Sequence, residues 1–191
     1  MKTFLSLLLV LFVSWGSTAS VQLLAAADMY QGQVIDEETG QPLIGAAVTV
    51  IWYKTPFVQQ ERSLYFQNAQ ETVTDSQGKF SLLVSPGTDW NPFTVIIKEP
   101  TIIIFQPGYE PVQAVWLLRM GFKSHTEFAA ALKKGFVVKL LKLKTDKELR
   151  YYSDVGTLVH PRVPGERIPK LVETFNIQRK NLGYQPVPLG K

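Results

Sequence analysis

The stretch GQVIDEETGQPLIGAAVTV, residues 32–50, indicates the fold class of this chain. Apolar and polar residues alternate on both sides of a polar turn that contains Gly40 and Pro42, a pattern typical of two half-buried β-strands. We expect the two strands to pair as a hairpin. Since the stretch contains no group of residues suited to catalysis, it bears on the fold and not on an activity.

The rest of the chain predicts further short strands separated by turns. The turn at residues 75–78 places Gly78 where a left-handed backbone conformation is needed, so a second hairpin is expected between Val73 and Phe80. Residues 53–68 break the alternation and are predicted to be a long connection with room for a short strand. The later expected elements are strands at residues 93–98, 101–106 and 135–146 and a short helix at residues 126–134, capped by Thr126.

The C-terminal tail predicts a helix at residues 168–182. Pro169 suits its first turn and Gly183 suits its C-terminal cap. An isolated helix of this length is marginal in water, so we expect its apolar stripe to pack on the outside of the β-structure. About seven strands followed by this helix predict an all-β sandwich with a helical appendage. The stripe consists of Ile168, Leu171, Val172, Phe175 and Leu182.

Two ordered motifs in the chain match those of a known family. The first is G-x-V-x-D, a turn and P-L-x-G-A-x-V-x-V, and the second is T-D-x-x-G-x-F, followed later by Gly108 and Tyr109. By these motifs the chain resembles the carboxypeptidase regulatory-like domain over residues 30–144. The resemblance implies a mainly β fold, a seven-stranded transthyretin-like (prealbumin-like) β-sandwich, here with a C-terminal α-helix. The matching residues are Gly32, Val34, Asp36, Pro42, Leu43, Gly45, Ala46, Val48, Val50, Thr74, Asp75, Gly78 and Phe80.

The resemblance implies a module and not an activity. In carboxypeptidases such a domain accompanies a zinc peptidase domain, and in outer-membrane receptors it precedes a plug and a barrel; this sequence resembles neither part. The matching residues have structural explanations. Gly45 and Ala46 are expected to keep side chains small at a close strand approach, and Asp75 is expected to accept backbone donors in its turn.

The N-terminus has the features of a targeting segment. Lys2 precedes an apolar run at residues 4–15, and small residues follow. We predict a signal peptide at residues 1–27, cleaved after residue 19 or 27. The alternative is an uncleaved membrane anchor, since no charge occurs between Lys2 and Asp28. The chain contains no Cys, which suits a disulfide-free protein exported to the periplasm or cell surface of a bacterium.

Charge divides the chain into two parts. Residues 28–132 carry 6 Lys or Arg and 11 Asp or Glu, a net charge of −5, whereas residues 133–191 carry 13 and 5, a net charge of +8. The basic residues are spaced along the tail, so we expect it to pack on the acidic domain and not to bind nucleic acid. The predicted organisation is a β-sandwich at residues 28–145 and a basic C-terminal extension at residues 146–191.

The sequence offers little chemistry for a metal or a catalytic site. Its only histidines, His125 and His160, lie far apart and lack a zinc-binding spacing, so no zinc ion, catalytic residue or cofactor is predicted. No nucleophile elbow or phosphate-binding loop is present. Turn acids could hold Ca²⁺ if they met at one end of a sandwich, although such acids are usually solvated. These acids are Asp36, Glu37, Glu38 and Asp75.

Aromatic residues gather around the connection at residues 53–68 and form the candidate contact surface. On a loop they would grip a protein or a glycan, and otherwise they would pin the loop to the fold. We therefore expect a non-enzymatic exported module with a structural or protein-interaction role in the bacterial cell envelope. The alternatives are a carbohydrate-binding module and a hydrolase whose site is assembled from scattered residues. The candidate surface consists of Trp52, Tyr53, Phe57, Tyr65 and Phe66.

Overall fold

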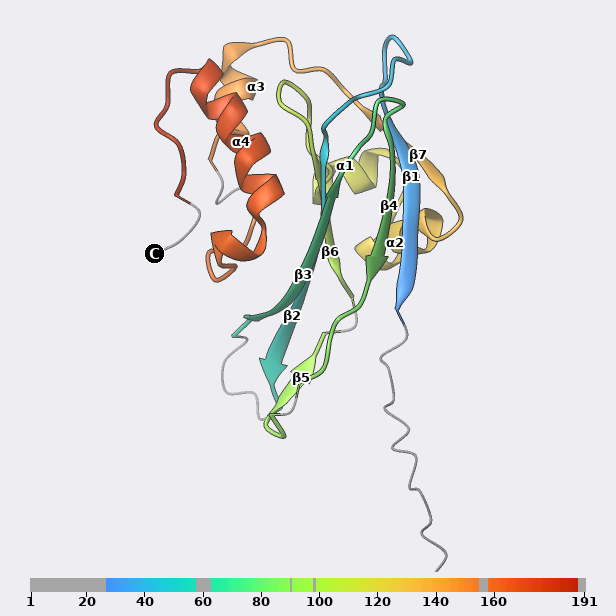
Figure 1. Cartoon of the computed structure of the whole chain (residues 1–191), viewed down its shortest axis with the longest axis vertical. Helices are drawn as coiled ribbons and strands as arrows, with labels where there is room; N and C mark the ends of the chain where they lie inside the picture. The colour runs from blue at the N-terminus through green and yellow to red at the C-terminus, as the bar shows by residue number, and fades with distance from the viewer. Residues whose placement is uncertain (1–26, 58–62, 90, 98, 155–157, 189–191) are drawn as a thin grey trace, which may run out of the picture.

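The computed structural model describes residues 27–57, 63–89, 91–97, 99–154 and 158–188, so the predicted signal peptide lies outside the described residues apart from residue 27. The chain is mainly β, with two sheets, as the sequence predicts (Figure 1). In the first sheet, sheet A, β1 is the central strand, antiparallel to β4 and parallel to β7. Sheet A consists of β4 (Lys79–Val84), β1 (Asp28–Asp36) and β7 (Phe136–Leu140).

The second sheet, sheet B, is built around β2 and is antiparallel throughout. One edge of β2 pairs with β3, and the other edge pairs with β6 along its first half and with β5 at its end. The last residues of β2 extend beyond its pairing with β6 and pair with β5 instead. This end of β2 and β5 together project from the rest of the sheet (Figure 1). Sheet B consists of β3 (Tyr65–Val73), β2 (Ala47–Pro56), β5 (Thr94–Ile96) and β6 (Thr101–Phe105).

The two predicted hairpins are wrong, because each turn carries the chain from one sheet to the other. β1 and β2 lie in different sheets, and so do β3 and β4. Thr74 bridges the two turns: its hydroxyl accepts a hydrogen bond from Ala46 N at 2.9 Å and donates to Leu43 O at 2.6 Å. Period-two alternation identifies the buried face of a strand but not its partner, which explains the error.

The predicted connection at residues 53–68 is also largely wrong. β2 continues to Pro56, and β3 already begins at Tyr65. The alternation at residues 44–50 correctly indicated a strand, but β2 is buried on both faces over its first seven residues and is not the half-buried strand that was predicted. The register between β2 and β3 also shifts between Trp52 and Tyr53, which disturbs the pattern further.

Two glycines of the first motif are required for different reasons, one for its backbone conformation and the other for a close strand approach. Gly45 has φ of 76° and a Cβ at that position would meet nothing within 4 Å, so the expected close strand approach is not its reason. Close approach occurs at Gly32 instead, where a Cβ would lie 2.4 Å from the carbonyl oxygen of Phe136 on the neighbouring strand β7.

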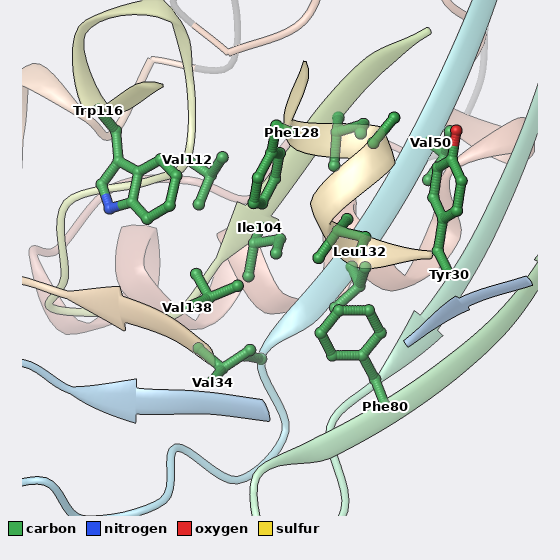
Figure 2. Close-up of a cluster of buried hydrophobic side chains, with 14 of the residues drawn as sticks. Tyr30, Val34, Val50, Phe80, Ile104, Val112, Trp116, Phe128, Leu132 and Val138 are labelled. Carbon is green, nitrogen blue, oxygen red and sulfur yellow. The ribbon is translucent and has the colours of Figure 1, made fainter. Parts of the chain in front are cut away.

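The main apolar core fills the space between the sheets. Val34 of β1, Phe80 of β4 and Val138 of β7 meet Val50 of β2 and Ile104 of β6 there, and all five are buried (Figure 2). Burial of this kind is the main stabilising contribution to a chain that has no disulfide. One face of every strand in sheet A therefore packs in this core.

Two short helices close the side of this core. They are α1 (Ala114–Arg119) and α2 (His125–Leu132), and they contribute Trp116, Phe128 and Leu132 to the cluster (Figure 2). The helix at residues 126–134 was thus predicted about one residue late. Its cap is Ser124 and not Thr126, since the Ser124 side chain accepts a hydrogen bond from Glu127 N.

The tail forms a second layer on the outer face of sheet B. It contains α3 (Asp146–Tyr151), the 3-10 turn η2 (Gly165–Arg167) and α4 (Pro169–Asn181). Figure 1 shows α4 alongside β2 and β3, on the side away from β1. α3 was not predicted, although Thr145 and Glu148 form a capping box that marks its start.

Four of the five residues of the predicted apolar stripe pack where they were expected, whereas Leu182, the C-cap of α4, is only partly buried and lies outside the cluster. Ile168, Leu171, Val172 and Phe175 are buried in a second cluster with residues of β2 and β6, including Ile51 and Phe105. The rings of Phe105 and Phe175 lie 5.6 Å apart. Basic residues of the tail add contacts to aromatic rings of β3, with Arg162 over Tyr65 at 4.9 Å and Arg167 over Phe66 at 5.3 Å.

Two polar side chains fix the position of α4. Glu71 of β3 accepts hydrogen bonds from Lys170 N and Leu171 N, each at 3.0 Å, which satisfies donors in the first turn of the helix. Gln178, near the other end, is buried; it accepts from Gly108 N at 2.9 Å and donates to Leu149 O at 3.1 Å. The tail is therefore held by directional bonds as well as by apolar burial.

Candidate binding site

The five aromatic residues predicted as a contact surface do not lie on one exposed face. Trp52 is buried between the sheets, whereas Tyr53 is buried on the opposite side of β2, in the cluster beneath the tail. Successive residues of a strand point to opposite faces, so these two side chains cannot act together. Both are thereby excluded from an exposed platform.

The other three predicted residues differ in exposure. Phe66 is half-buried against the outer cluster, and Tyr65 is 43% exposed with Arg162 over one face of its ring. Phe57 is 73% exposed at the end of β2. Four of the five residues thus contribute to packing, which leaves Phe57 as the open aromatic side chain of the set.

A pocket of about 450 Å³ opens where the projecting end of sheet B faces α1 and the start of α2. Tyr53 and Leu64 line one side, and Leu117, Leu118 and Phe122 line the other. These side chains give the pocket a mainly apolar wall, and Leu118 is 70% exposed at its rim. Tyr53 is the predicted site residue that the structure places in this pocket.

Three polar side chains that line the pocket are already hydrogen-bonded to backbone groups of the protein. His125 Nδ1 accepts a hydrogen bond from Ile102 N at 3.2 Å, and Glu99 Oε1 accepts from Thr126 N at 3.2 Å. The Ser124 hydroxyl caps α2 through Glu127 N at 3.3 Å. Each group supports the backbone, so the pocket has the arrangement of a binding site more than that of a nucleophile with its base.

The electrostatics of His125 agree with a binding role. Burial lowers the pKa of its imidazole, while nearby Glu99 acts in the opposite direction. The side chain is therefore neutral at pH 7, and since Nδ1 accepts a hydrogen bond, Nε2 carries the proton. A neutral imidazole N–H can orient a ligand as a hydrogen-bond donor.

Sequence reasoning missed this pocket because its two sides come from distant segments. Ile97, Glu99 and Pro100 lie between β5 and β6, whereas the lining residues from Ala114 to His125 lie on α1, on the connection after it and at the start of α2. A local signal existed at Ser124 and Glu127, whose spacing marks a helix start. That signal places a helix in the chain, but it does not indicate what the helix faces.

The turn acids do not converge on a calcium site. Asp36 accepts hydrogen bonds from Glu38 N and Thr39 N, each at 2.8 Å, and from the Tyr109 hydroxyl at 2.9 Å. Asp75 likewise accepts from backbone N–H groups of its own turn. Across the described parts of the chain, no three His, Cys, Asp or Glu side chains are grouped so that they could hold a metal ion.

The hydrogen bonds to Asp36 have an electrostatic consequence. The pKa of Asp36 is lowered, chiefly by the backbone hydrogen bond from Thr39. Burial, reinforced by the hydrogen bond to Asp36, raises the pKa of Tyr109 to about 12. The pair joins the end of β1 to the segment after β6, so these groups serve the fold.

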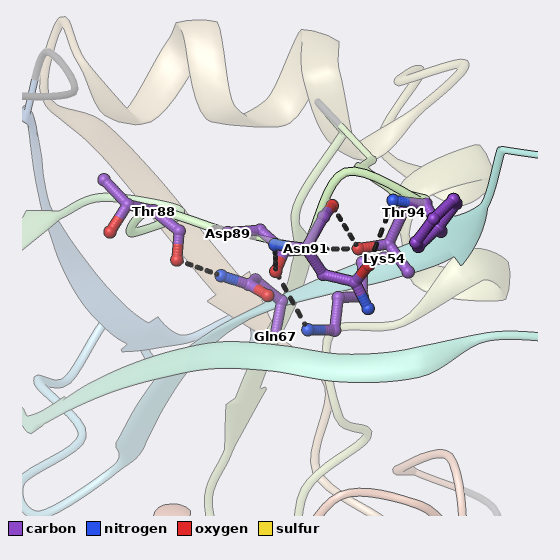
Figure 3. Close-up of polar contacts among 7 residues, drawn as sticks. Lys54, Gln67, Thr88, Asp89, Asn91 and Thr94 are labelled. Carbon is purple, nitrogen blue, oxygen red and sulfur yellow. Dashed lines mark hydrogen bonds and ion pairs between the residues drawn. The ribbon is translucent and has the colours of Figure 1, made fainter.

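A second polar cluster supports the end of sheet B beside β5 (Figure 3). Asp89 accepts hydrogen bonds from Lys54 Nζ at 3.3 Å, from Asn91 N at 3.1 Å and from the hydroxyl of Thr94. Gln67 Nε2 donates to Thr88 O at 3.1 Å. The cluster ties the chain before β5 to β2 and β3, and the Asp89 side chain is 10% exposed.

Comparisons with known proteins give this chain no relative. No protein-family model matches it, and no curated protein sequence matches it. Among solved structures, a 9R-lipoxygenase from Cyanothece PCC8801 aligns with a TM-score of 0.29 and 10% identity, over 82% of this chain and 24% of the lipoxygenase chain. A similarity at that level carries no argument about fold or function. Within the described residues no helix is long and apolar enough to cross a membrane.

Proposed function

We propose that this protein is a non-enzymatic, exported β-sandwich module of the carboxypeptidase regulatory-like, transthyretin-like type, which binds a partner protein in the bacterial cell envelope. The two facing sheets and the left-handed glycines at Gly45 and Gly78, within the matching motifs, support the family assignment. The apolar segment at residues 4–15 supports export to the periplasm or cell surface.

One observation carries the binding role: His125 Nδ1, Glu99 Oε1 and the Ser124 hydroxyl, which line the 450 Å³ pocket, are hydrogen-bonded to backbone N–H groups, while Leu118 at the pocket is apolar and exposed. Such a pocket suits an apolar side chain of a partner, with His125 Nε2–H as an orienting donor. A hydrolase would need a nucleophile and a base that are free to act on a substrate. A glycan site is less favoured, since Trp52 and Tyr53 are buried and Arg162 covers one face of Tyr65.

The test is photo-crosslinking in intact cells from a photoreactive residue placed at position 118. The control is position 115, since Val115 is also on α1 and 63% exposed but does not line the pocket. We expect a discrete adduct from position 118, and Leu118→Asp should weaken association with the crosslinked protein by about ten-fold, the effect of losing roughly 1.4 kcal/mol. Equal adducts from both positions, or hydrolysis of an ester, peptide or glycoside that His125→Gln abolishes, would contradict the proposal.

The mature form of the chain gives a separate test of export. We expect the intact mass from the envelope fraction to begin after residue 19 or 27. A mass that still includes residues 1–15 would support the membrane anchor instead. Binding to purified peptidoglycan, unaffected by Leu118→Asp, would favour the carbohydrate-binding alternative.

A further inference from the structure

His125, the first residue of α2, joins that helix to the edge of sheet B. Its Nδ1 atom accepts a hydrogen bond from Ile102 N of β6 at 3.2 Å. This N–H lies on the edge of β6 that faces away from β2, since the carbonyl oxygen of Ile104, two residues further along, accepts from Val112 N on the same edge. The imidazole therefore satisfies a strand donor at a position where another strand would otherwise be needed.

A second hydrogen bond attaches the same turn of α2 to sheet B. Thr126 N donates to Oε1 of Glu99, in the segment between β5 and β6, at 3.2 Å. The rest of the helix is held differently, since Phe128 and Leu132 are buried in the main core (Figure 2). The start of α2 is thus attached to sheet B by polar contacts, while the body of the helix is anchored by apolar burial.

Protonation of His125 would remove the first contact and weaken the second. An imidazolium carries a hydrogen on both nitrogens and has no acceptor, so its Nδ1–H would point at the Ile102 N–H. Glu99 is the carboxylate whose charge favours the protonated ring. An imidazolium that turns toward Glu99 competes with Thr126 N for the same carboxylate. A single proton therefore acts on both contacts between the start of α2 and sheet B.

The surroundings of the ring keep it neutral until the solution is acidic. Burial lowers the pKa of His125 and outweighs the opposite effect of Glu99. The pocket lining among the described residues also includes Tyr53 on β2, whose pKa is raised by burial, and Lys123 in the connection before α2. On α2 itself, the Glu127 carboxylate accepts from Lys123 N at 2.8 Å. Titration near neutral pH in this pocket is therefore expected at His125.

From this geometry we propose that His125 is an acid-sensitive switch, whose protonation releases the start of α2 from the edge of sheet B and opens the pocket wall that Ser124 and His125 form. The stability linked to the closed form is fully present above the ordinary pKa of 6.5 and is lost as the pH falls from that value through the lowered pKa. The switch belongs to the chain alone. Its consequence for binding, release of the partner's side chain on acidification, rests on the proposed function above, since Leu118 lines the same pocket.

The amide of Ile102 reports the switch directly. The chain with His160→Gln retains His125 as its sole histidine, and its amide exchange is followed by NMR between about pH 5 and about pH 8. The protection factor is the intrinsic exchange rate divided by the measured rate. We expect that of Ile102 to fall below pH 6.5 by up to about ten-fold per pH unit, because opening takes up one proton. The control is the Val34 amide of β1, bonded to Gly78 O at 2.7 Å, whose protection should not follow this titration. Equal pH dependence at the two amides would overturn the proposal.

A variant that keeps the acceptor but cannot titrate separates the switch from a general effect of acid. In His125→Asn, combined with His160→Gln, the amide oxygen at position 125 can accept from Ile102 N and stays neutral. The protection of Ile102 should then be independent of pH below its ordinary titration range. A fall of the same size in this variant would overturn the proposal.

A measurement that leaves position 125 unchanged covers the case in which His125→Asn does not fold. The imidazole nitrogen chemical shifts of the His160→Gln chain should show a proton on Nε2 alone at about pH 8, as the bond from Ile102 N requires. A proton on Nδ1 at that pH would overturn the proposal. These measurements use no partner, so their failure leaves the crosslinking test at position 118 intact, and failure of the crosslinking test leaves the switch intact.

Discussion

The outer faces of the two sheets differ although both sheets contribute to the same core. In β1, Tyr30 and Val34 face the core, while Gln31 and Gln33 face solvent on the open side of sheet A. In β2, every residue from Ala47 to Tyr53 is buried, because one face meets the core and the other meets the tail. The tail is therefore part of the hydrophobic structure of this protein and not an addition to its surface.

The two layers therefore differ in how independently each can unfold. The core between the sheets involves strands from Asp28 to Leu140, distant in sequence, so we expect it to be lost only in a global transition. The outer layer is formed by one C-terminal segment on one face of sheet B, and such a segment can detach while the sheets remain folded. Four experiments test this difference between the layers, from the largest expected effect to the smallest.

The largest effect is expected in the core. Phe128 is fully buried, and its ring lies 5.4 Å from that of Trp116 and 5.2 Å from that of Phe122. Phe128→Ala should lower the free energy of unfolding by about 3–5 kcal/mol, through lost burial and the cavity that remains. Urea unfolding measures this loss. Hydrogen exchange should accelerate in both sheets together, and acceleration confined to α2 would argue against a single core.

A smaller and more local effect is expected beneath the tail. Phe175 is fully buried on α4, yet Phe175→Ala should lower global stability by less than the roughly 3–5 kcal/mol typical of a buried Phe, since the tail can undock first. Amides of residues 171–179 should then exchange rapidly, while those of β1 and β7 stay protected. Equal loss of protection in α4 and β1 would show that the two layers unfold as one unit.

The two layers should also respond to pH with opposite signs. Burial raises the pKa of Glu71, the β3 residue that is hydrogen-bonded to the start of α4. The stability linked to Glu71 is therefore fully present below its ordinary pKa of 4.5 and is lost as the pH rises through the raised pKa. The pKa of Asp36 is lowered, so its contribution is present above 3.8 and is lost as the pH falls through the lowered pKa.

Glu71→Gln and Asp36→Asn isolate these two contributions. Urea unfolding of each variant beside the natural chain, from pH values below 3.8, the ordinary value for Asp36, to values well above 4.5, the ordinary value for Glu71, gives the stability difference at each pH. The advantage of the natural chain over Glu71→Gln should shrink as the pH rises, whereas its advantage over Asp36→Asn should grow. Parallel slopes for the two variants would contradict the assignment of opposite environments.

The sequence predicted the layers better than their connections. The stripe of α4 and the burial of Phe80 and Val34 follow from periodicity, because the buried face of a strand or helix produces a regular spacing of apolar residues. The choice of strand partner produces no such local pattern, which is why both turns that connect the two sheets were predicted as hairpins. β2 shows a further limit, since its alternation predicts one solvated face, whereas both faces are buried, one in the core and one beneath the tail.

The candidate site was predictable only in part for a related reason. Trp52, Tyr53 and Phe57 are close in sequence, but their side chains lie in different places. Trp52 is in the core, Tyr53 is in the outer cluster, and Phe57 is exposed at the end of β2. Phe93, the cross-strand neighbour of Phe57, comes from a segment more than thirty residues away in the sequence. Clustering along the chain therefore indicated that aromatics matter here, but the backbone geometry decides which of them meet.

The smallest effect is expected on the open face of sheet A. Leu83 of β4 is 60% exposed opposite Met29 of β1, with no tail above it among the described residues. Leu83→Ser removes little burial, so the free energy of unfolding should change by no more than about 0.5 kcal/mol. The matched change on the covered face, Ile103→Ser in β6, should cost several times more, because Ile103 is buried beneath the tail. If the two substitutions proved equally costly in urea unfolding of the isolated protein, the open face would have to be covered by a further segment or a second copy.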